Sequence, residues 1–292
     1  MIKEVFENSY EKLESIIREK LNSVNANEKE QKRAENELNM IKEKGDAQLF
    51  LFLYELAKYM RGNGIYFGTR GLFYTSLYCC YLLGVLDYNP MKYSLSHEVY
   101  LDSKGALDLD IESKSYEKVI YFLRKNFSEK QLFRLAFYDG EKDKWEKHAV
   151  SFVLFRNEND NKMDTVNING ETTVKKSEVQ TWKSENYFVF SLLRLKVIDF
   201  IKKTEKERKN KIDYKNFEDE EVFEFMEKTQ LNPHFYLCEK IKANKPRTLK
   251  DLVLCSYLDE IKKRSFGHWI SYGVHYYKLA YIKKYFNKDF EG

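Results

Sequence analysis

The sequence is poor in proline, the residue that most often interrupts regular structure. It has 3 prolines among 292 residues, against 22 tyrosines and 21 phenylalanines. Disordered segments are typically rich in proline and poor in aromatic residues, so this composition argues against a disordered chain and favours an ordered, helix-rich one. A chain of this length can form one large domain or two small ones with a real core.

Cysteine is also scarce. The 4 cysteines are Cys79, Cys80, Cys238 and Cys255. They show no Cys-x-x-Cys spacing, which argues against a zinc site and against a disulfide framework. We therefore expect core thiols in a reducing cytoplasm.

The sequence has neither a long hydrophobic run nor a strong charge of one sign. The longest apolar run, residues 77–86, is too short to span a bilayer, and Met1 is followed by a charged helical pattern instead of a signal peptide. We therefore expect a cytoplasmic protein with no membrane partner. The formal net charge of +4 does not separate a nucleic-acid-binding protein from an ordinary soluble one.

Helical and strand patterns both occur along the chain, which predicts an α+β fold. Three amphipathic helices are expected at the N-terminus, over residues 9–22, 30–44 and 48–60, and we interpret them as a helical buttress. Further helices are expected over 115–126, 194–203, 218–229, 234–243, 248–263 and 266–286, and further strands over 132–138, 150–155 and 187–193. Asn169-Gly170 separates two short strand-like runs, which predicts a β-hairpin.

The best candidate for a functional site is the segment 107–112, which reads Leu-Asp-Leu-Asp-Ile-Glu. Side chains alternate along a strand, so Asp108, Asp110 and Glu112 share one face while the apolar residues between them face the core. Two carboxylates about 7 Å apart on one strand can hold a divalent cation against phosphates. The alternative is that they form the solvated face of an ordinary strand.

A glycine-containing turn precedes this strand and opens an apolar helix. It reads Gly68-Thr69-Arg70-Gly71. The backbone amides at the start of a helix favour anions, so this turn is a candidate phosphate site.

These motifs resemble, in order and in spacing, the palm of the family C bacterial DNA polymerases, the alpha subunit of DNA polymerase III. That family has a Gly-Arg-Gly-Ser turn, an Asp-x-Asp/Asn-Pro-Leu-Lys-Tyr loop, a Glu-Arg-Phe-Leu segment and Pro-Asp-Ile-Asp-Ile-Asp. The matching segments here are residues 69–72, 87–93, 98–101 and 107–112. The resemblance extends over residues 30–290. It implies a nucleotidyltransferase-like palm, which is a small mixed sheet with helices.

The resemblance also implies how the chain is divided. We expect a helical lead-in over residues 1–62, a palm-like domain over 63–205 and a helical fingers-like subdomain over 206–292. The charge-dense segment 202–215 marks the boundary between the last two. His148-Ala149 matches a histidine–alanine pair that precedes a buried strand in the family, and we interpret His148 as a structural residue.

The last helix, from residue 266, is similar to the fingers helix that lies over the incoming nucleotide in the family. Its aromatic residues form one stripe at helical spacing, which predicts a buried face. The other side carries a polar row of His268, Ser271, His275 and Lys278. This row is either ordinary surface or a face that contacts phosphate or base.

The resemblance implies that the chain binds a nucleoside triphosphate and DNA with Mg²⁺, or with Mn²⁺ in its place. Asp108 and Asp110 would be the catalytic, metal-bridging carboxylates, and Glu112 would be a further metal ligand. The nucleotide-binding residues would be Arg70, Gly71, Ser76, His268 and Lys278.

The sequence departs from the family pattern at three positions of this site. Ser191 stands where the family has its third metal-binding aspartate, Val189 where it has a lysine, and Leu72 where the turn has its serine. A neutral hydroxyl is a poor ligand for a hard dication. Two hypotheses therefore stay open: a compact polymerase or nucleotidyltransferase with a remodelled metal site, and a catalytically inactive polymerase-like protein. The second would bind nucleic acid or a protein partner in replication, in a mobile element or in defence.

Overall fold

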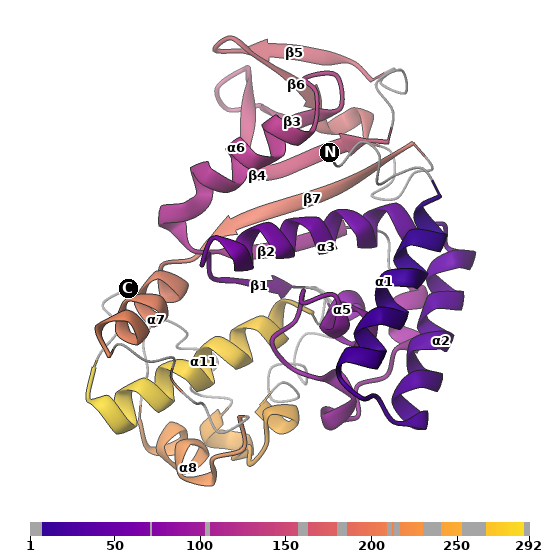
Figure 1. Ribbon diagram of the computed structural model, residues 1–292. Helices are drawn as coiled ribbons and strands as arrows, with labels where there is room; N and C mark the ends of the chain where they lie inside the picture. The colour runs from indigo at the N-terminus through magenta and orange to yellow at the C-terminus, as the bar shows by residue number, and fades with distance from the viewer. Residues whose placement is uncertain are drawn as a thin grey trace.

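The computed structural model describes residues 8–70, 72–102, 106–156, 163–179, 186–208, 212, 217–229, 241–252 and 267–288. Within these residues a seven-stranded mixed sheet is flanked by helices (Figure 1). Its strands are β1 (Phe67–Arg70), β2 (Ala106–Ile111), β3 (Leu132–Asp139), β4 (Lys144–Phe155), β5 (Thr165–Ile168), β6 (Glu171–Lys175) and β7 (Tyr187–Arg194). The α-helices are α1 (Ser9–Ser23), α2 (Glu28–Glu43), α3 (Ala47–Gly62), α4 (Leu72–Thr75), α5 (Tyr78–Leu82), α6 (Tyr116–Asn126), α7 (Lys196–Glu207), α8 (Glu220–Lys228) and α11 (Gly267–Phe286). Short 3₁₀ helices η2 (Pro90–Tyr93), η3 (Glu98–Asp102), η4 (Ser113–Ser115) and η5 (Lys176–Glu178) connect them.

The strand order in the sheet is β1-β2-β7-β4-β3-β6-β5. The pairs β2–β7 and β3–β6 are parallel, and the other neighbouring pairs are antiparallel. The predicted α+β fold with a mixed sheet is therefore confirmed. In the part of the chain that the structure describes, no helix is long and apolar enough to cross a bilayer.

The three N-terminal helices form where the sequence predicted them. A capping box begins α2, because the Asn27 side chain accepts from the Glu30 amide (3.1 Å) and the Glu30 carboxylate accepts from the Asn27 amide (3.0 Å). The predicted hairpin is also present as β5 and β6. Asn169 and Gly170 between them have φ angles of 51° and 79°, which a tight two-residue turn of the type favoured in hairpins requires.

A glycine turn was predicted at residues 68–71, and this prediction is wrong for residues 68–70. Residues up to Arg70 form β1, which pairs antiparallel with β2, and Gly71 lies outside the described residues. The single apolar helix predicted after it is also wrong, because α4 and α5 are separate short helices. Leu77 between them has an extended backbone with φ −88° and ψ 127°. Strand pairing with β2, a contact distant in sequence, outweighs the local turn signal.

The thiol prediction is confirmed for Cys79 and Cys80, which are buried and reduced, whereas Cys238 and Cys255 lie outside the described residues. The helices predicted over 234–243 and 248–263 also lie largely outside those residues.

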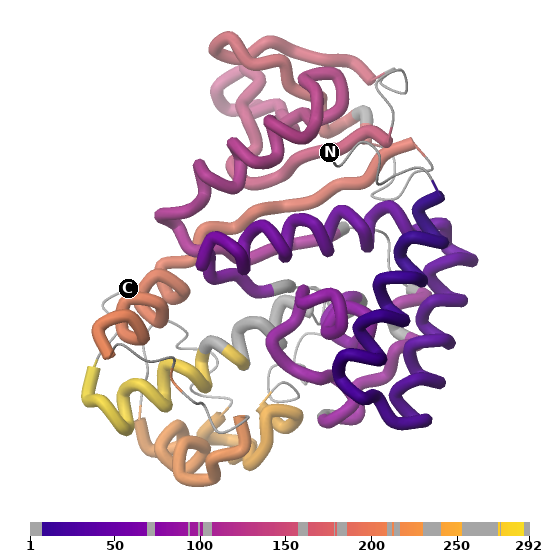
Figure 2. Tube along the Cα trace, viewed as in Figure 1, coloured from indigo at the N-terminus to yellow at the C-terminus, as the bar shows by residue number. Residues whose placement is uncertain are grey.

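Helix α3 packs across one face of the sheet. Its Phe52 ring lies against the Phe188 and Phe190 rings of β7, with centroids 5.1 Å apart in both pairs. Helix α6 lies beside α3, and Tyr59 of α3 stacks on Phe122 of α6 at 3.9 Å. The indigo helices α1 and α2 stand beside α3 in the trace of Figure 2. The N-terminal helices therefore support the sheet from one side, as the sequence predicted.

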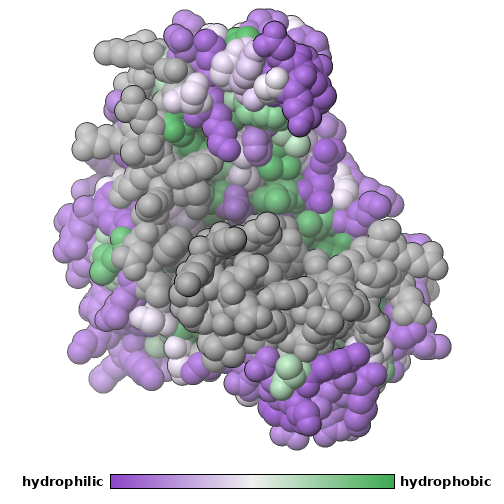
Figure 3. All heavy atoms as spheres, turned by 180° about the vertical axis from the view of Figure 1, so that it is seen from behind, coloured by the Kyte–Doolittle hydropathy of each residue, from purple (hydrophilic) through white to green (hydrophobic). Residues whose placement is uncertain are grey.

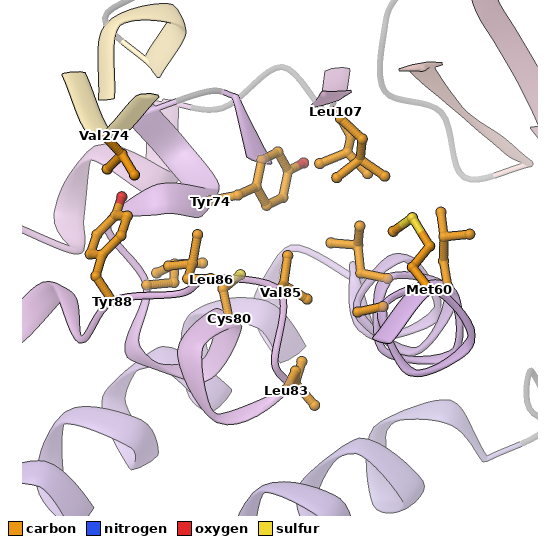
Figure 4. Close-up of a cluster of buried hydrophobic side chains, with 14 of the residues drawn as sticks. Met60, Tyr74, Cys80, Leu83, Val85, Leu86, Tyr88, Leu107 and Val274 are labelled. Carbon is orange, nitrogen blue, oxygen red and sulfur yellow. The ribbon is translucent and has the colours of Figure 1, made fainter. Parts of the chain in front are cut away.

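The C-terminal helix α11 packs against β1 and α4, far from its own position in the sequence (Figure 1). Tyr276, Tyr277 and Ala280 of its predicted stripe are fully buried, at 0% exposure. Figure 4 shows Val274 of α11 beside Tyr88, in a cluster of buried side chains. The cluster also contains Tyr74 of α4 and Cys80 of α5, the two helices that follow β1 in the sequence. The end of the chain is thereby fixed next to the edge of the sheet that carries β1 and β2.

A buried ion pair holds the segment between β1 and β2 to helix α2. The Glu37 carboxylate, which is fully buried, accepts from the two backbone amides that start α5 (3.0 and 2.8 Å). Arg33 pairs with Glu37 and also donates to the carbonyl oxygens of Ser76 (2.9 Å) and Leu95 (3.0 Å). Helix α2 thus fixes the loops that lead into β2.

Candidate functional site

Strand β2 turns its two aspartates to the face of the sheet opposite α3. Leu107, Leu109 and Ile111 are buried at 0%, 1% and 0% exposure in the core that includes α3. The alternate residues Asp108 and Asp110 therefore lie on the other face. Asp108 is partly exposed, whereas Asp110 is fully buried. The structure brings the two predicted catalytic residues together on one strand face.

The edge strand β1 lies directly beside these aspartates. Gly68 is the cross-strand partner of Asp110, and Arg70 is the partner of Asp108. Directly opposed residues on neighbouring strands share a face and have Cβ atoms about 5 Å apart. The backbone of Arg70 is thus adjacent to Asp108, while its side chain, like Gly71, lies outside what the structure describes. Gly68 has no side chain, so no β1 side chain covers Asp110 from the opposed position.

Two serines continue the row from Asp108 across the sheet. Ser191 of β7 is the partner of Asp108 in the parallel pair, and Ser151 of β4 is the partner of Ser191. The two serine hydroxyl oxygens are 3.0 Å apart. Ser191 therefore occupies the position next to Asp108 where a third carboxylate would have to lie. No sequence pattern indicates Ser151, because only the register between β4 and β7 brings it to this row.

His148 lies near the same row. Its Nδ1 accepts from the Ser151 amide at 3.2 Å, so in the neutral ring the proton is on Nε2. Burial and the nearby Lys176 lower the pKa of His148, and the negative charge of Asp108 opposes this shift. The imidazole is therefore neutral at pH 7 and within electrostatic range of Asp108.

Glu112 follows the last residue of β2 and precedes the 3₁₀ turn η4. Its backbone is extended, with φ −59° and ψ 135°, and its amide donates to the Tyr66 carbonyl oxygen at 3.0 Å, so its common face with Asp110 stays a prediction. Its carboxylate is 2% exposed, forms an ion pair with Lys202 of α7 at 2.5 Å and accepts from the Ser115 hydroxyl. A metal ion would have to displace Lys202 to bind there, because the carboxylate is already neutralised.

The nucleotide-binding residues predicted outside this row are spread over the fold. Ser76 is fully buried in the connection between α4 and α5, so a nucleotide could not contact it without moving its surroundings. Lys278 of α11 has a side chain 14% exposed, with its Nζ 3.9 Å from the Oδ2 of Asp87. The Oδ1 of Asp87 accepts from Arg61 at 2.9 Å. His268 lies in the first turn of α11, and its side chain is outside the description.

The aspartate row offers few ligands for a metal ion. Among the residues that the structure describes, no group of three or more His, Cys, Asp or Glu side chains is placed to hold a metal ion. Asp108 and Asp110 offer carboxylate oxygens, and Ser191 offers a neutral hydroxyl in place of a third carboxylate. The donors present are those that hard cations such as Mg²⁺ and Mn²⁺ prefer, but they are too few for a closed protein cage.

A mixed α+β fold with two aspartates on one sheet face is consistent with a polymerase-like domain. Residues 4–206, more than half of the chain, match the family model described as "Bacterial DNA polymerase III alpha NTPase domain". The chain therefore belongs to the bacterial DNA polymerase III alpha family. The matched range contains β1, β2 and β7 with the aspartate row, and α8 and α11 lie beyond it.

The chain is also similar to error-prone DNA polymerases. The one from Sinorhizobium medicae is 31% identical over 104 residues, which are 34% of this chain and 9% of that protein. The one from Burkholderia mallei is 32% identical over 99 residues, 32% of this chain and 9% of that protein. The one from Mycolicibacterium paratuberculosis is 28% identical over 141 residues, 40% and 13% respectively. This chain thus spans only a small part of the length of the curated relatives it matches.

Proposed function

We propose that the chain is a compact nucleotidyltransferase module of the DNA polymerase III alpha type, which binds a nucleoside triphosphate and DNA. With a divalent cation it would transfer the nucleotidyl group to a DNA 3′-hydroxyl and release pyrophosphate. The observation that carries this proposal is the pair Asp108 and Asp110 on one face of β2, beside β1, in a chain of this family. Polymerases of this kind transfer a nucleotide to a primer hydroxyl by positioning and charge neutralisation.

The two aspartates are the candidate ligands of a single divalent cation that would take its remaining ligands from substrate phosphates and water. Asp110 is fully buried, so the cation would have to reach it from the side of Asp108. Glu112 is held by Lys202, and Ser191 is neutral, so this chain supplies no third carboxylate among its described residues at this position. When bound, such a cation neutralises the charge of the triphosphate. Asp108, which is partly exposed, is the carboxylate that a substrate reaches first.

We assign phosphate binding next to the aspartates to Arg70 and to the backbone around Gly71. Arg70 is the cross-strand partner of Asp108 on the antiparallel neighbour, so its backbone lies beside the aspartate. A guanidinium is suited to a triphosphate because it presents several donors in a fixed plane. Helix α4 has four residues and adds little dipole, so the arginine and individual amides carry this role.

We assign the other side of the nucleotide site to α11. This helix packs on β1 and α4, next to the strand that carries Arg70. Its Lys278 would pair with a phosphate, for which it would leave Asp87. His268 at the start of the same helix is the second candidate from the fingers-like segment. We do not assign Ser76 a role in nucleotide binding, because it is fully buried.

The proposal is tested by primer extension and terminal transfer with Mg²⁺ and with Mn²⁺. We expect the protein to add nucleotides, and we expect Asp108→Asn and Asp110→Asn to abolish addition while circular dichroism shows them folded. Glu141→Gln, in the exposed turn between β3 and β4, is the matched control and should leave addition unchanged. Absence of nucleotide addition together with absence of metal-dependent triphosphate binding by calorimetry would refute the enzyme and leave a binding protein.

A further inference from the structure

The sheet face that carries Asp108 extends well beyond the aspartates. It continues through Ser191 on β7 and Ser151 on β4, whose hydroxyl oxygens are 3.0 Å apart. Figure 3 shows the side of the molecule away from α3, where hydrophobic surface is visible between the hydrophilic upper rim and the grey residues. Val153 and Val189 on this face are buried, whereas Asp108, Ser191 and His148 are partly exposed, so only the row that these three residues mark is open to a larger part of a substrate.

Strand register places an exposed aromatic ring on this face. Val189 is two residues before Ser191, and it pairs with Val153, which in turn pairs with Phe133 of β3. These residues therefore share the face of Ser191, and so does Phe137, four residues after Phe133. Among the described residues Phe137 is one of the large hydrophobic residues that are exposed, with the lowest value of that group, 36%.

Two polar groups lie around this ring. The imidazole of His148 is 6.1 Å from the Phe137 ring in an edge-to-face arrangement, and its Nδ1 is held by the Ser151 amide. Lys176 follows β6, is exposed, and is close enough to His148 to influence its charge. The Nε2 proton of His148 is therefore a hydrogen-bond donor beside an exposed aromatic ring, and Lys176 is a cation near this imidazole.

The carboxylate of Glu146, next to Phe137 in the sheet, is neutralised by two lysines. Glu146 is the cross-strand partner of Phe137. Its carboxylate forms ion pairs with Lys142 at 3.1 Å and with Lys144 at 3.3 Å. The negative charge opposite Phe137 is thus balanced by two lysines.

We propose that Phe137, His148 and Lys176 form a binding track for a single DNA strand, which leads across β3, β4 and β7 to Asp108. A base stacks on Phe137, and the phosphates on either side accept hydrogen bonds from His148 Nε2 and Lys176. The strand is the primer of the proposed reaction, and to that extent the inference rests on the proposed function. Binding itself needs neither nucleotide nor metal and is measured separately.

The chain offers a matched pair of aromatic residues for the test. Tyr138 follows Phe137 on β3, is 49% exposed, and points to the opposite face, where it packs against Trp145. Fluorescence anisotropy with a labelled single-stranded oligodeoxynucleotide in EDTA measures the Kd of each variant. We expect Phe137→Ala to raise the Kd about 10-fold through loss of one stacked base, and Tyr138→Ala to leave it unchanged.

A salt titration separates the role of Lys176 from that of Phe137. Lys176→Ala should reduce the slope of log Kd against log salt concentration by about 0.7, because one fewer counterion is released from a single strand. Phe137→Ala should leave the slope unchanged. His148→Ala should weaken binding, and His148→Gln, which retains a donor, should restore part of it.

Equal Kd values for Phe137→Ala and Tyr138→Ala, or an unchanged salt slope for Lys176→Ala, would overturn the track. Both aromatic side chains are partly exposed, and thermal unfolding checks that each variant is folded. Failure of the proposed function has a different signature. There the wild type would bind the strand with the predicted dependence on Phe137 and yet add no nucleotide.

Discussion

Ser191 is the neighbour of Asp108 on the next strand of the sheet. It lies in register beside Asp108, and its hydroxyl is within 3.0 Å of the Ser151 hydroxyl. A carboxylate at this position would add a third hard ligand and would have to displace the hydroxyl contact. Side-chain alternation predicted the common face of Asp108 and Asp110, because it is a local property of one strand.

We predict that Ser191→Asp raises Mg²⁺-dependent nucleotide addition by about 10-fold or more, since a further carboxylate next to Asp108 strengthens metal binding at the reacting hydroxyl. Ser191→Asn has nearly the same shape without the charge and serves as the control. Single-turnover primer extension measures the rate. A Ser191→Asp protein that is no faster than Ser191→Asn would show that this position does not contribute to the metal site.

Glu112 and Lys202 are 90 residues apart in the sequence, and no periodicity predicted that they would pair. The pair is largely buried, with side chains 3% and 16% exposed. The resemblance suggested a metal ligand at Glu112, whereas the structure pairs this carboxylate with Lys202.

We predict that Lys202→Met lowers the free energy of unfolding by about 3 kcal/mol, because it leaves a buried carboxylate without its cation. Urea unfolding measures this loss. Adding Glu112→Gln to Lys202→Met should recover most of it, and Glu112→Gln alone should not change the affinity for Mn²⁺. A Glu112→Gln protein that binds Mn²⁺ more weakly would show instead that Glu112 is a metal ligand.

Helix α2 is the element that fixes the segment leading from β1 to β2. Its Glu37 accepts from the first amides of α5, and its Arg33 donates to two carbonyl oxygens of the same segment. Helix periodicity predicted α2 to within two residues at each end. It did not predict the buried ion pair, because charged residues at i and i+4 are far more often on the surface.

We predict that Glu37→Ala lowers the free energy of unfolding by about 3–5 kcal/mol, since Arg33 and two amides lose a buried partner. The chain contains a matched control in α1, where Arg18 and Glu14 have the same i, i+4 spacing but side chains 57% and 31% exposed. Glu14→Ala should cost less than about 1 kcal/mol. Similar losses in the two variants by urea unfolding would contradict the anchoring role of α2.

The strand β1 could not be predicted from the sequence. Two glycines around Thr69 and Arg70 are typical of a turn, and the apolar residues that follow favour a helix. Pairing with β2 makes the first part a strand, and this contact is tertiary. The consequence for the site is that Arg70 lies beside Asp108 through strand register instead of through a helix N-terminus.

At the scale of the whole molecule, one buried cluster joins segments that the sequence assigned to three parts. It runs from Leu13 in α1, through Leu107 in β2, to Ile282 in α11. The C-terminal segment is further attached by Tyr277, whose hydroxyl accepts from the Asp219 amide at the start of α8 (3.0 Å). A shared core couples the stability of its parts.

We therefore predict a single cooperative unfolding transition. Far-ultraviolet circular dichroism and tyrosine fluorescence, recorded against urea, should give the same midpoint, and Tyr277→Phe should shift both midpoints together. An early transition confined to one probe would show that the segment after residue 206 unfolds separately, as the predicted division into a palm-like and a fingers-like part would allow.

The central claim is that Asp108 and Asp110 hold a divalent cation together with a triphosphate. Electron paramagnetic resonance of Mn²⁺, titrated with the protein and a non-hydrolysable deoxynucleoside triphosphate, measures the ternary complex directly. We predict that the wild-type protein forms this complex and that Asp108→Asn and Asp110→Asn reduce the signal to that of Mn²⁺ with triphosphate alone. Asparagine variants that bind Mn²⁺ and triphosphate as well as the wild type would contradict it.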